Sequence, residues 1–146
     1  MKRSDALQPL SRDHHRALEA ALKLRRASAE DAEEVSRQFL DFWREHGGAH
    51  FRIEEEVMLP AFARHGDHTD PRVVRVLTDH VAIRRRAADL DARGTPRPED
   101  LKVLGEMLDA HVRHEERVLF PLIEQSLPAE ALAELAQRVE DAERSA

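Results

Sequence analysis

Apolar residues recur every three or four positions through most of the chain, which is the spacing of one buried helix face. Turn-forming residues divide this pattern into segments. It predicts four long helices, over about 9–27, 28–64, 71–92 and 99–125, and a shorter amphipathic helix over 129–143. Long helices with short connections favour an all-α fold, an antiparallel up-down-up-down four-helix bundle with the short C-terminal helix packed outside it.

Local signals set the expected helix boundaries. Residues 28–31 (SAED) have the form of a capping box, and Pro71 follows an Asp at the first position of the third helix. Gly47 and Gly48 are an expected weak point in the long second helix. Pro60 lacks a backbone N–H, so we expect the helix to bend or end near it.

Composition limits the classes of function. The chain has 146 residues, which suits one domain, with the bundle over about 7–125. A net charge of −6 argues against a general partner such as nucleic acid or an anionic membrane. There is no apolar run of about 18 residues and no apolar run behind the N-terminus, so we expect a cytoplasmic protein. Because the chain has no Cys, any metal must be held by imidazole and carboxylate groups.

The clearest chemical signal is an internal duplication. Residues 50–60 (HFRIEEEVMLP) recur as residues 111–121 (HVRHEERVLFP), and in both copies a Glu follows the first His by four positions and a Pro follows it by ten. A shorter Asp-His pair at 13–14 recurs at 79–80, upstream of the second copy. Duplicated metal-ligand residue types on facing helices indicate a metal site between the helices.

A helix turns about 100° per residue, so the position of each residue predicts whether its side chain lies on the apolar stripe. The residues that fall on a buried face are His14, His46, His50, Glu54, His80, His111 and Glu115. Glu55, Glu116 and His114 are expected to turn away from the core, and Leu77 is expected within it. A buried carboxylate costs several kcal/mol unless it is paired or binds a metal. Six ligands suit two ions about 3.5–4 Å apart with the carboxylates between them.

The His-x3-Glu spacing alone is weak, since about one occurrence is expected by chance at this composition. A third copy, His15 to Glu19, indeed points away from the core. The prediction depends on the repeated context, the buried direction and the separate Asp-His repeat taken together.

These residues, with the apolar-Pro endings at 59–60 and 120–121, resemble the hemerythrin-like (HHE cation-binding) domain over about residues 7–125. The resemblance implies a non-haem diiron centre, bridged by two carboxylates and an oxo or hydroxo group. Members of the family are associated with binding O₂, or with responses to oxygen, NO, peroxide or iron. The ligands that the resemblance implies are His14, His50, Glu54, His80, His111 and Glu115.

One position departs from the oxygen-carrying hemerythrins, which have a further His four residues after the ligand of the third helix. Here that residue is Arg84. His46 could replace the missing imidazole or orient a neighbouring ligand. Alternatively, the coordination position is open to O₂, NO or peroxide.

Three functions follow. The first is a module that binds or senses a small diatomic ligand or peroxide at two iron ions. The second is an enzyme that reduces O₂ or peroxide, or oxidises Fe²⁺. The third is a structural bundle with zinc or no metal; zinc and manganese both accept imidazole and carboxylate ligands. The sequence indicates no particular protein partner.

Overall fold

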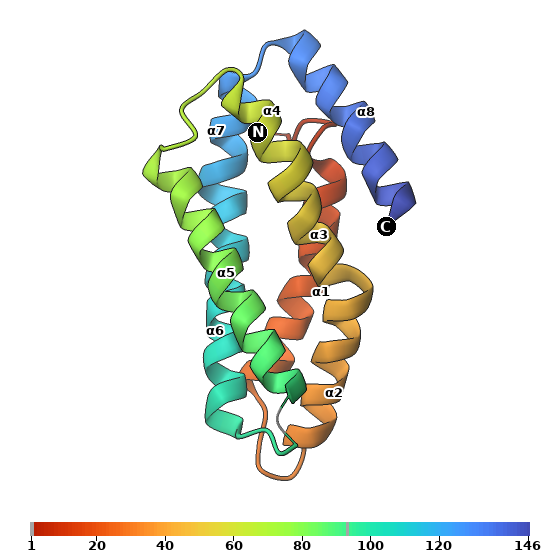
Figure 1. Ribbon diagram of the computed structural model, residues 1–146, viewed down its shortest axis with the longest axis vertical. Helices are drawn as coiled ribbons and strands as arrows, with labels where there is room; N and C mark the ends of the chain where they lie inside the picture. The colour runs from red at the N-terminus through yellow and green to blue at the C-terminus, as the bar shows by residue number, and fades with distance from the viewer. Residues whose placement is uncertain (1, 93) are drawn as a thin grey trace.

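The computed structural model describes residues 2–92 and 94–146, and these form helices joined by short loops, with no strand among them (Figure 1). Four helical columns make the bundle. The first column is α1 (Gln8–Arg25), and the third is α5 (Pro71–Ala92). The second column joins five segments: α2 (Ala32–Phe42), η1 (Trp43–Gly47), α3 (Gly48–Ile53), η2 (Glu54–Met58) and α4 (Leu59–Ala63). The fourth column joins α6 (Pro98–His114), η3 (Glu115–Leu119) and α7 (Phe120–Ser126), and the separate helix α8 (Ala129–Ser145) follows it.

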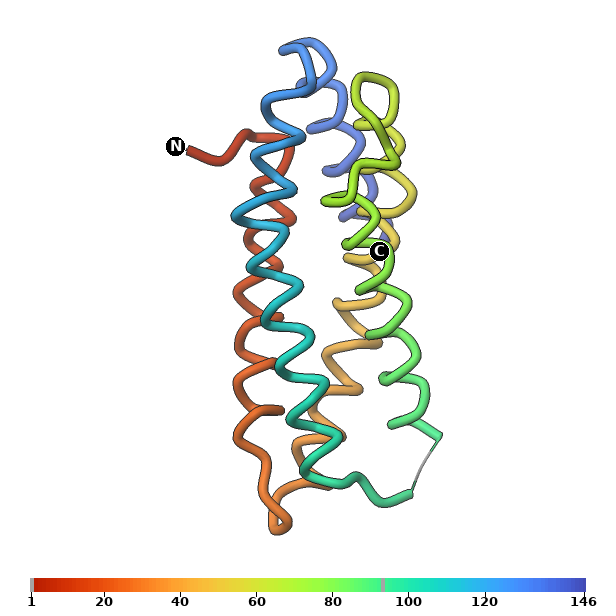
Figure 2. Tube along the Cα trace, turned by 90° about the vertical axis from the view of Figure 1, so that its left-hand side faces the viewer, coloured from red at the N-terminus to blue at the C-terminus, as the bar shows by residue number. Residues whose placement is uncertain are grey.

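Successive columns run in opposite directions, which confirms the antiparallel four-helix bundle (Figures 1 and 2). Column two begins at Ala32, four residues later than the capping box predicted. The Ser28 hydroxyl and backbone N–H both donate to the Asp31 carboxylate, at 3.2 and 2.7 Å. These bonds close the loop before the helix, so Ser28 does not cap it.

None of the helices in the described part of the chain is both long enough and apolar enough to cross a membrane.

The η segments are single turns of π-helix within the columns. In η2 the Leu59 N–H donates to the Glu54 carbonyl oxygen, five residues back, and in η3 Phe120 donates to Glu115 in the same way. A proline comes directly after each of these donors. Because a proline ring crowds the carbonyl four residues before it, a wider turn relieves the contact. Pro60 therefore widens the turn before it, and the helix continues to Ala63.

A polar layer divides the core of the bundle into two apolar clusters. One cluster fills the end of the bundle that α8 covers, and it includes Leu10, Met58, Phe62, Val76, Phe120, Leu135 and Val139. The other fills the opposite end and includes Ala17, Phe39, Phe51, Ile83, Leu104 and Leu108. The layer between them contains buried His and Glu side chains. Leu135 and Val139 fix α8 against the bundle, as its amphipathic pattern indicated.

Columns one and four lie side by side along much of their length (Figure 2). Gly105 on α6 permits the close approach: a Cβ there would lie 2.7 Å from the Ala21 carbonyl oxygen and 2.9 Å from Leu24 Cβ. On α5 the prediction for Leu77 is wrong, because this side chain is 41% exposed while Val76 beside it is buried.

Candidate metal centre

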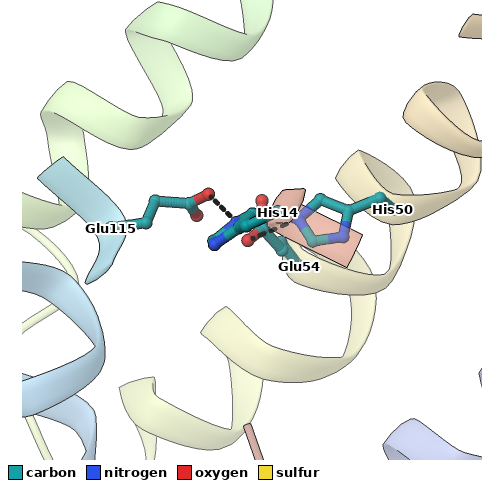
Figure 3. Close-up of side chains that lie close together, drawn as sticks. All are labelled: His14, His50, Glu54 and Glu115. Atoms are coloured by element: carbon teal, nitrogen blue, oxygen red, sulfur yellow. Dashed lines mark hydrogen bonds and ion pairs between the residues drawn. The ribbon is translucent and has the colours of Figure 1, made fainter. Parts of the chain in front are cut away.

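The six residues that the sequence predicted as ligands converge in the polar layer, and all six are buried. His14 comes from α1 and His80 from α5, while His50 and His111 come from α3 and α6. The carboxylates lie in the first turn of a π-helical segment, Glu54 in η2 and Glu115 in η3. Figure 3 shows four of the six side chains pointing toward one another.

The six residues form two groups of four. In each group one ligand atom per residue lies within 4.8 Å of the others: His14, His50, Glu54 and Glu115 in the first, and Glu54, His80, His111 and Glu115 in the second. Both carboxylates belong to both groups. Every imidazole turns Nε2 toward a carboxylate: His14 to Glu115 at 3.1 Å, His50 to Glu54 at 3.1 Å, His80 to Glu54 at 3.0 Å and His111 to Glu115 at 3.2 Å.

The other ring nitrogen of each imidazole contacts a second, outer carboxylate. The Nδ1 partners are Glu116 for His14 at 2.6 Å, Glu55 for His80 at 2.6 Å, Asp13 for His50 at 3.0 Å and Asp79 for His111 at 3.0 Å. A carboxylate only accepts, so Nδ1–H is the donor, and Nε2 is the nitrogen that a neutral imidazole would offer to an ion at the centre. This arrangement orients imidazoles for metal binding and raises their basicity.

Sequence reasoning missed these outer carboxylates. Glu55 and Glu116 were expected to turn outward, which is wrong, because each reaches the imidazole of a neighbouring column. The signal was present in the duplication, since an acidic residue follows each ligand Glu and precedes His14 and His80. His114 is also buried, and its Nε2 lies 3.0 Å from the Arg72 carbonyl oxygen.

The prediction that His46 lies on the buried face is wrong. Its side chain is 44% exposed and belongs to neither group. The π-helical turn η1, in which Gly48 donates to the Trp43 carbonyl oxygen, separates His46 from His50 by a wider turn than the regular helix assumed. The imidazole therefore lies at the surface, against Arg16 of α1.

The centre contains polar atoms that the described protein does not satisfy. Among residues 2–92 and 94–146, four buried atoms of the layer form no hydrogen bond, although the first two named lie only 3.1 Å apart: His50 Nε2, Glu54 Oε2, His111 Nε2 and Glu115 Oε2. Each such atom costs about 1–3 kcal/mol when left unpaired. All four are nitrogen or oxygen donors of the kind that divalent transition metals accept, so the residues fit a metal cation.

The electrostatics of the metal-free chain agree with this fit. Burial lowers the pKa of His111, but the carboxylates of Glu115 and Asp79 outweigh it and raise that pKa to about 10. Burial likewise raises the pKa of Glu115, but the imidazoles of His111 and His14 hold it well below its usual range. The two buried carboxylates thus require positive charge beside them, which a cation at the centre supplies.

A family model for the hemerythrin HHE cation-binding domain matches residues 7–123, most of the chain. The chain belongs to this family. Comparison with curated proteins and with solved structures found no match. Membership in a cation-binding family and the buried His/Glu cluster together identify a metal-binding hemerythrin domain.

Arg84 has a defined role in this hemerythrin domain. Its guanidinium donates to Glu55 at 3.1 Å and lies 5.6 Å from the centre of the Phe51 ring. Phe51 in turn stacks on the His80 imidazole, with ring centres 3.7 Å apart. Arg84 therefore supports the carboxylate that orients His80. Arg3 likewise supports Glu116, the carboxylate that orients His14, and its guanidinium lies 3.3 Å from that carboxylate.

The hemerythrin domain has a narrow pocket above the centre. Its apolar lining includes Phe42, Trp43, Phe51 and Leu108, and the buried ligand groups form its inner end, the base: His14, His50, His111 and Glu115. The cavity volume that a water-sized sphere can occupy is about 20 Å³. That volume is close to the roughly 10–15 Å³ that one water molecule needs. A ligand in this pocket is therefore limited to two or three heavy atoms.

Proposed function

We propose that this domain holds two iron ions and uses them to bind or sense a small diatomic molecule or peroxide. The observation that carries the proposal is the pair of four-residue groups that share both carboxylates. One ion would take His14 and His50, and the other would take His80 and His111. Glu54 and Glu115 would serve both ions.

The orientation of Glu54 supports two ions over one. Its Oε2 faces His50 at 3.1 Å, and its Oε1 faces His80 at 3.0 Å. The two oxygens of one carboxylate are thus directed at two different groups, as a bridging carboxylate requires. A single ion would take the ligands of one group and leave the other two imidazoles turned toward the carboxylates with no ion between them.

Several features of the chain favour iron and a small ligand. Imidazole and carboxylate donors without thiolate suit iron, along with zinc and manganese. The centre is buried between two apolar clusters, which keeps bulk water away from it. When bound, iron supplies reversible electron exchange with O₂, NO or peroxide, which zinc does not. The outer carboxylates hold the Nδ1 protons in place, so the imidazoles keep their orientation when a ligand enters.

Pocket size favours a binding or sensing role over turnover of an organic substrate. Sites for drug-sized molecules have several hundred Å³ of volume. The cavity volume here is about 20 Å³, which holds about one water molecule. Because the wall is apolar, a neutral diatomic molecule can reach the base without losing hydrogen bonds there.

The test is anaerobic loading of metal-free protein with Fe²⁺, followed by titration with NO, O₂ and peroxide under absorption spectroscopy. We expect about two irons per chain and a spectrum that changes on addition of the ligand. Glu54→Ala should lose both ions, because Glu54 belongs to both groups. His65→Ala, a change in the loop after α4, should keep both. Iron that binds but responds to none of the three ligands would contradict the function while leaving the metal site intact.

A further inference from the structure

The exposed polar side chains that line the pocket mark its mouth: Arg16 on α1 and His46 on η1, with the partly exposed Asp13 also in the lining. Arg16 Nη1 lies 3.0 Å from each ring nitrogen of His46, so the guanidinium rests against the imidazole across the opening. Both residues are exposed to solvent. The two columns that carry them are fixed by the apolar cluster below, in which Ala17 follows Arg16 directly.

Arg16 differs from the arginines that support the outer carboxylates. Arg3 and Arg84 each form an ion pair, with Glu116 and Glu55 respectively. In the part of the chain that the structure describes, Arg16 has no carboxylate within ion-pairing distance. Among these residues its guanidinium is therefore unpaired, although the Asp13 carboxylate lines the same pocket and Glu45 lies 3.9 Å from His46.

The part of the pocket between the mouth and the base, called the neck, is apolar and tightly packed. Trp43 forms one side, and Gly47 is adjacent: a Cβ at Gly47 would lie 2.7 Å from Trp43 Cε3 and 3.2 Å from Phe42 Cε2. A charge at the rim of a cleft with low-dielectric walls focuses its field along the cleft. Arg16 thus attracts an anion to the mouth, and the two iron ions proposed for the centre would draw it from there to the base.

We infer that Arg16 and His46 form a gate that selects small anions, of the size of azide, nitrite or hydroperoxide, for entry to the metal centre. Arg16 raises the local concentration of the anion, and its contact with His46 opens to admit it. The apolar neck and the volume of about 20 Å³ exclude larger anions such as phosphate esters. The gate rests on the proposed function, because the metal centre is where the anion binds.

The test compares a charged with a neutral ligand on iron-loaded protein. Stopped-flow absorption would follow azide binding to the oxidised protein and NO binding to the reduced protein, at about 0.1 M and about 1 M salt. For Arg16→Met we expect a fall in the azide association rate of about tenfold at the lower salt, the low end of steering by a charged cleft. The NO rate should not change. Arg16→Lys keeps the charge and should restore most of the azide rate.

Arg26→Met is the matched control. It removes the same charge from an exposed site just after α1, about 15 Å further along by the helical rise. That separation exceeds the screening length of about 10 Å at 0.1 M salt, so the azide rate should stay at the wild-type value. His46→Leu should leave the charge but open the contact, and it should raise the azide rate.

Three outcomes would overturn the gate. One is an azide rate for Arg16→Met equal to that of the wild type. Another is an equal fall in the azide and NO rates, which would mean that the substitution only narrows the pocket. The third is loss of iron from Arg16→Met, which would make Arg16 part of the site itself. If the wild-type protein holds iron that binds neither azide nor NO, the proposed function fails together with the gate.

Discussion

Replacing Asp79 by Asn tests whether the outer carboxylates support metal binding. Asp79 Oδ2 accepts the Nδ1–H of His111 at 3.0 Å, and the Asp side chain is 27% exposed. Asn preserves the shape and an accepting oxygen but removes the charge. Loss of such a partner typically weakens metal affinity by about 10–100-fold, which corresponds to about 1.4–2.7 kcal/mol. Because Asp79 is partly exposed and Asn still accepts a hydrogen bond, we expect the lower end, about tenfold.

The assay is a competition titration of metal-free protein with a chromophoric chelator and Fe²⁺ under anaerobic conditions. His111 belongs to one of the two groups, so the titration should resolve one weakened site and one site close to wild-type affinity. Arg75→Gln is the control: Arg75 lies 3.8 Å from Asp79 but is 51% exposed, and an exposed pair contributes at most about 1 kcal/mol. If Asp79→Asn bound both ions as tightly as the wild type, or no more weakly than Arg75→Gln, the outer carboxylates would have no role in metal binding.

The other predictions concern the ligands, the packing and the pH dependence. His14→Ala should lower metal content and melting temperature while the exposed His15→Ala changes neither, and plasma mass spectrometry with thermal melts would show whether the two variants differ. Gly105→Ala should destabilise the bundle in urea by about 1–3 kcal/mol, because its Cβ meets a backbone carbonyl of α1. Gly94→Ala, which meets nothing within 4 Å, should change it by less than about 1 kcal/mol; equal effects would refute the packing argument. In metal-free protein the pKa of His111 is raised to about 10, so its contribution to stability is complete below the ordinary value of 6.5 and is lost as pH rises toward 10. Urea unfolding from pH 6 to 10 should show that decline, and rising stability would contradict it.

Much of the architecture follows from patterns that are local in the chain. Apolar spacing predicted the helical columns because burial of one face per helix dominates their stability. The duplication then brought six residues to one level of the bundle, since equivalent positions in antiparallel repeats meet at the same height. Prediction and structure agree most closely for His50 and Glu54 and for their counterparts His111 and Glu115. Both the duplication and the rotation of about 100° per residue predicted these positions.

The errors arise where the helix is not regular or where neighbouring columns meet. A constant rotation of about 100° per residue placed His46 on the buried face. The π-helical turn η1 changes the rotation between residues before His50 is reached. The same method turned Glu55 and Glu116 outward, because it contains no information about which imidazole lies across the interface. Their roles depend on the approach of another column, which only the packed structure contains. Leu77 is 41% exposed although Val76 beside it is buried, because consecutive residues of a helix point about 100° apart.

The most direct test of the account is the metal content of the purified, untagged protein after growth with both iron and zinc available. The two groups with shared carboxylates predict about two irons per chain. Glu54→Ala, measured in parallel, should contain close to none. Zinc alone, a single ion per chain, or full iron content in Glu54→Ala would contradict a centre in which Glu54 and Glu115 serve two iron ions.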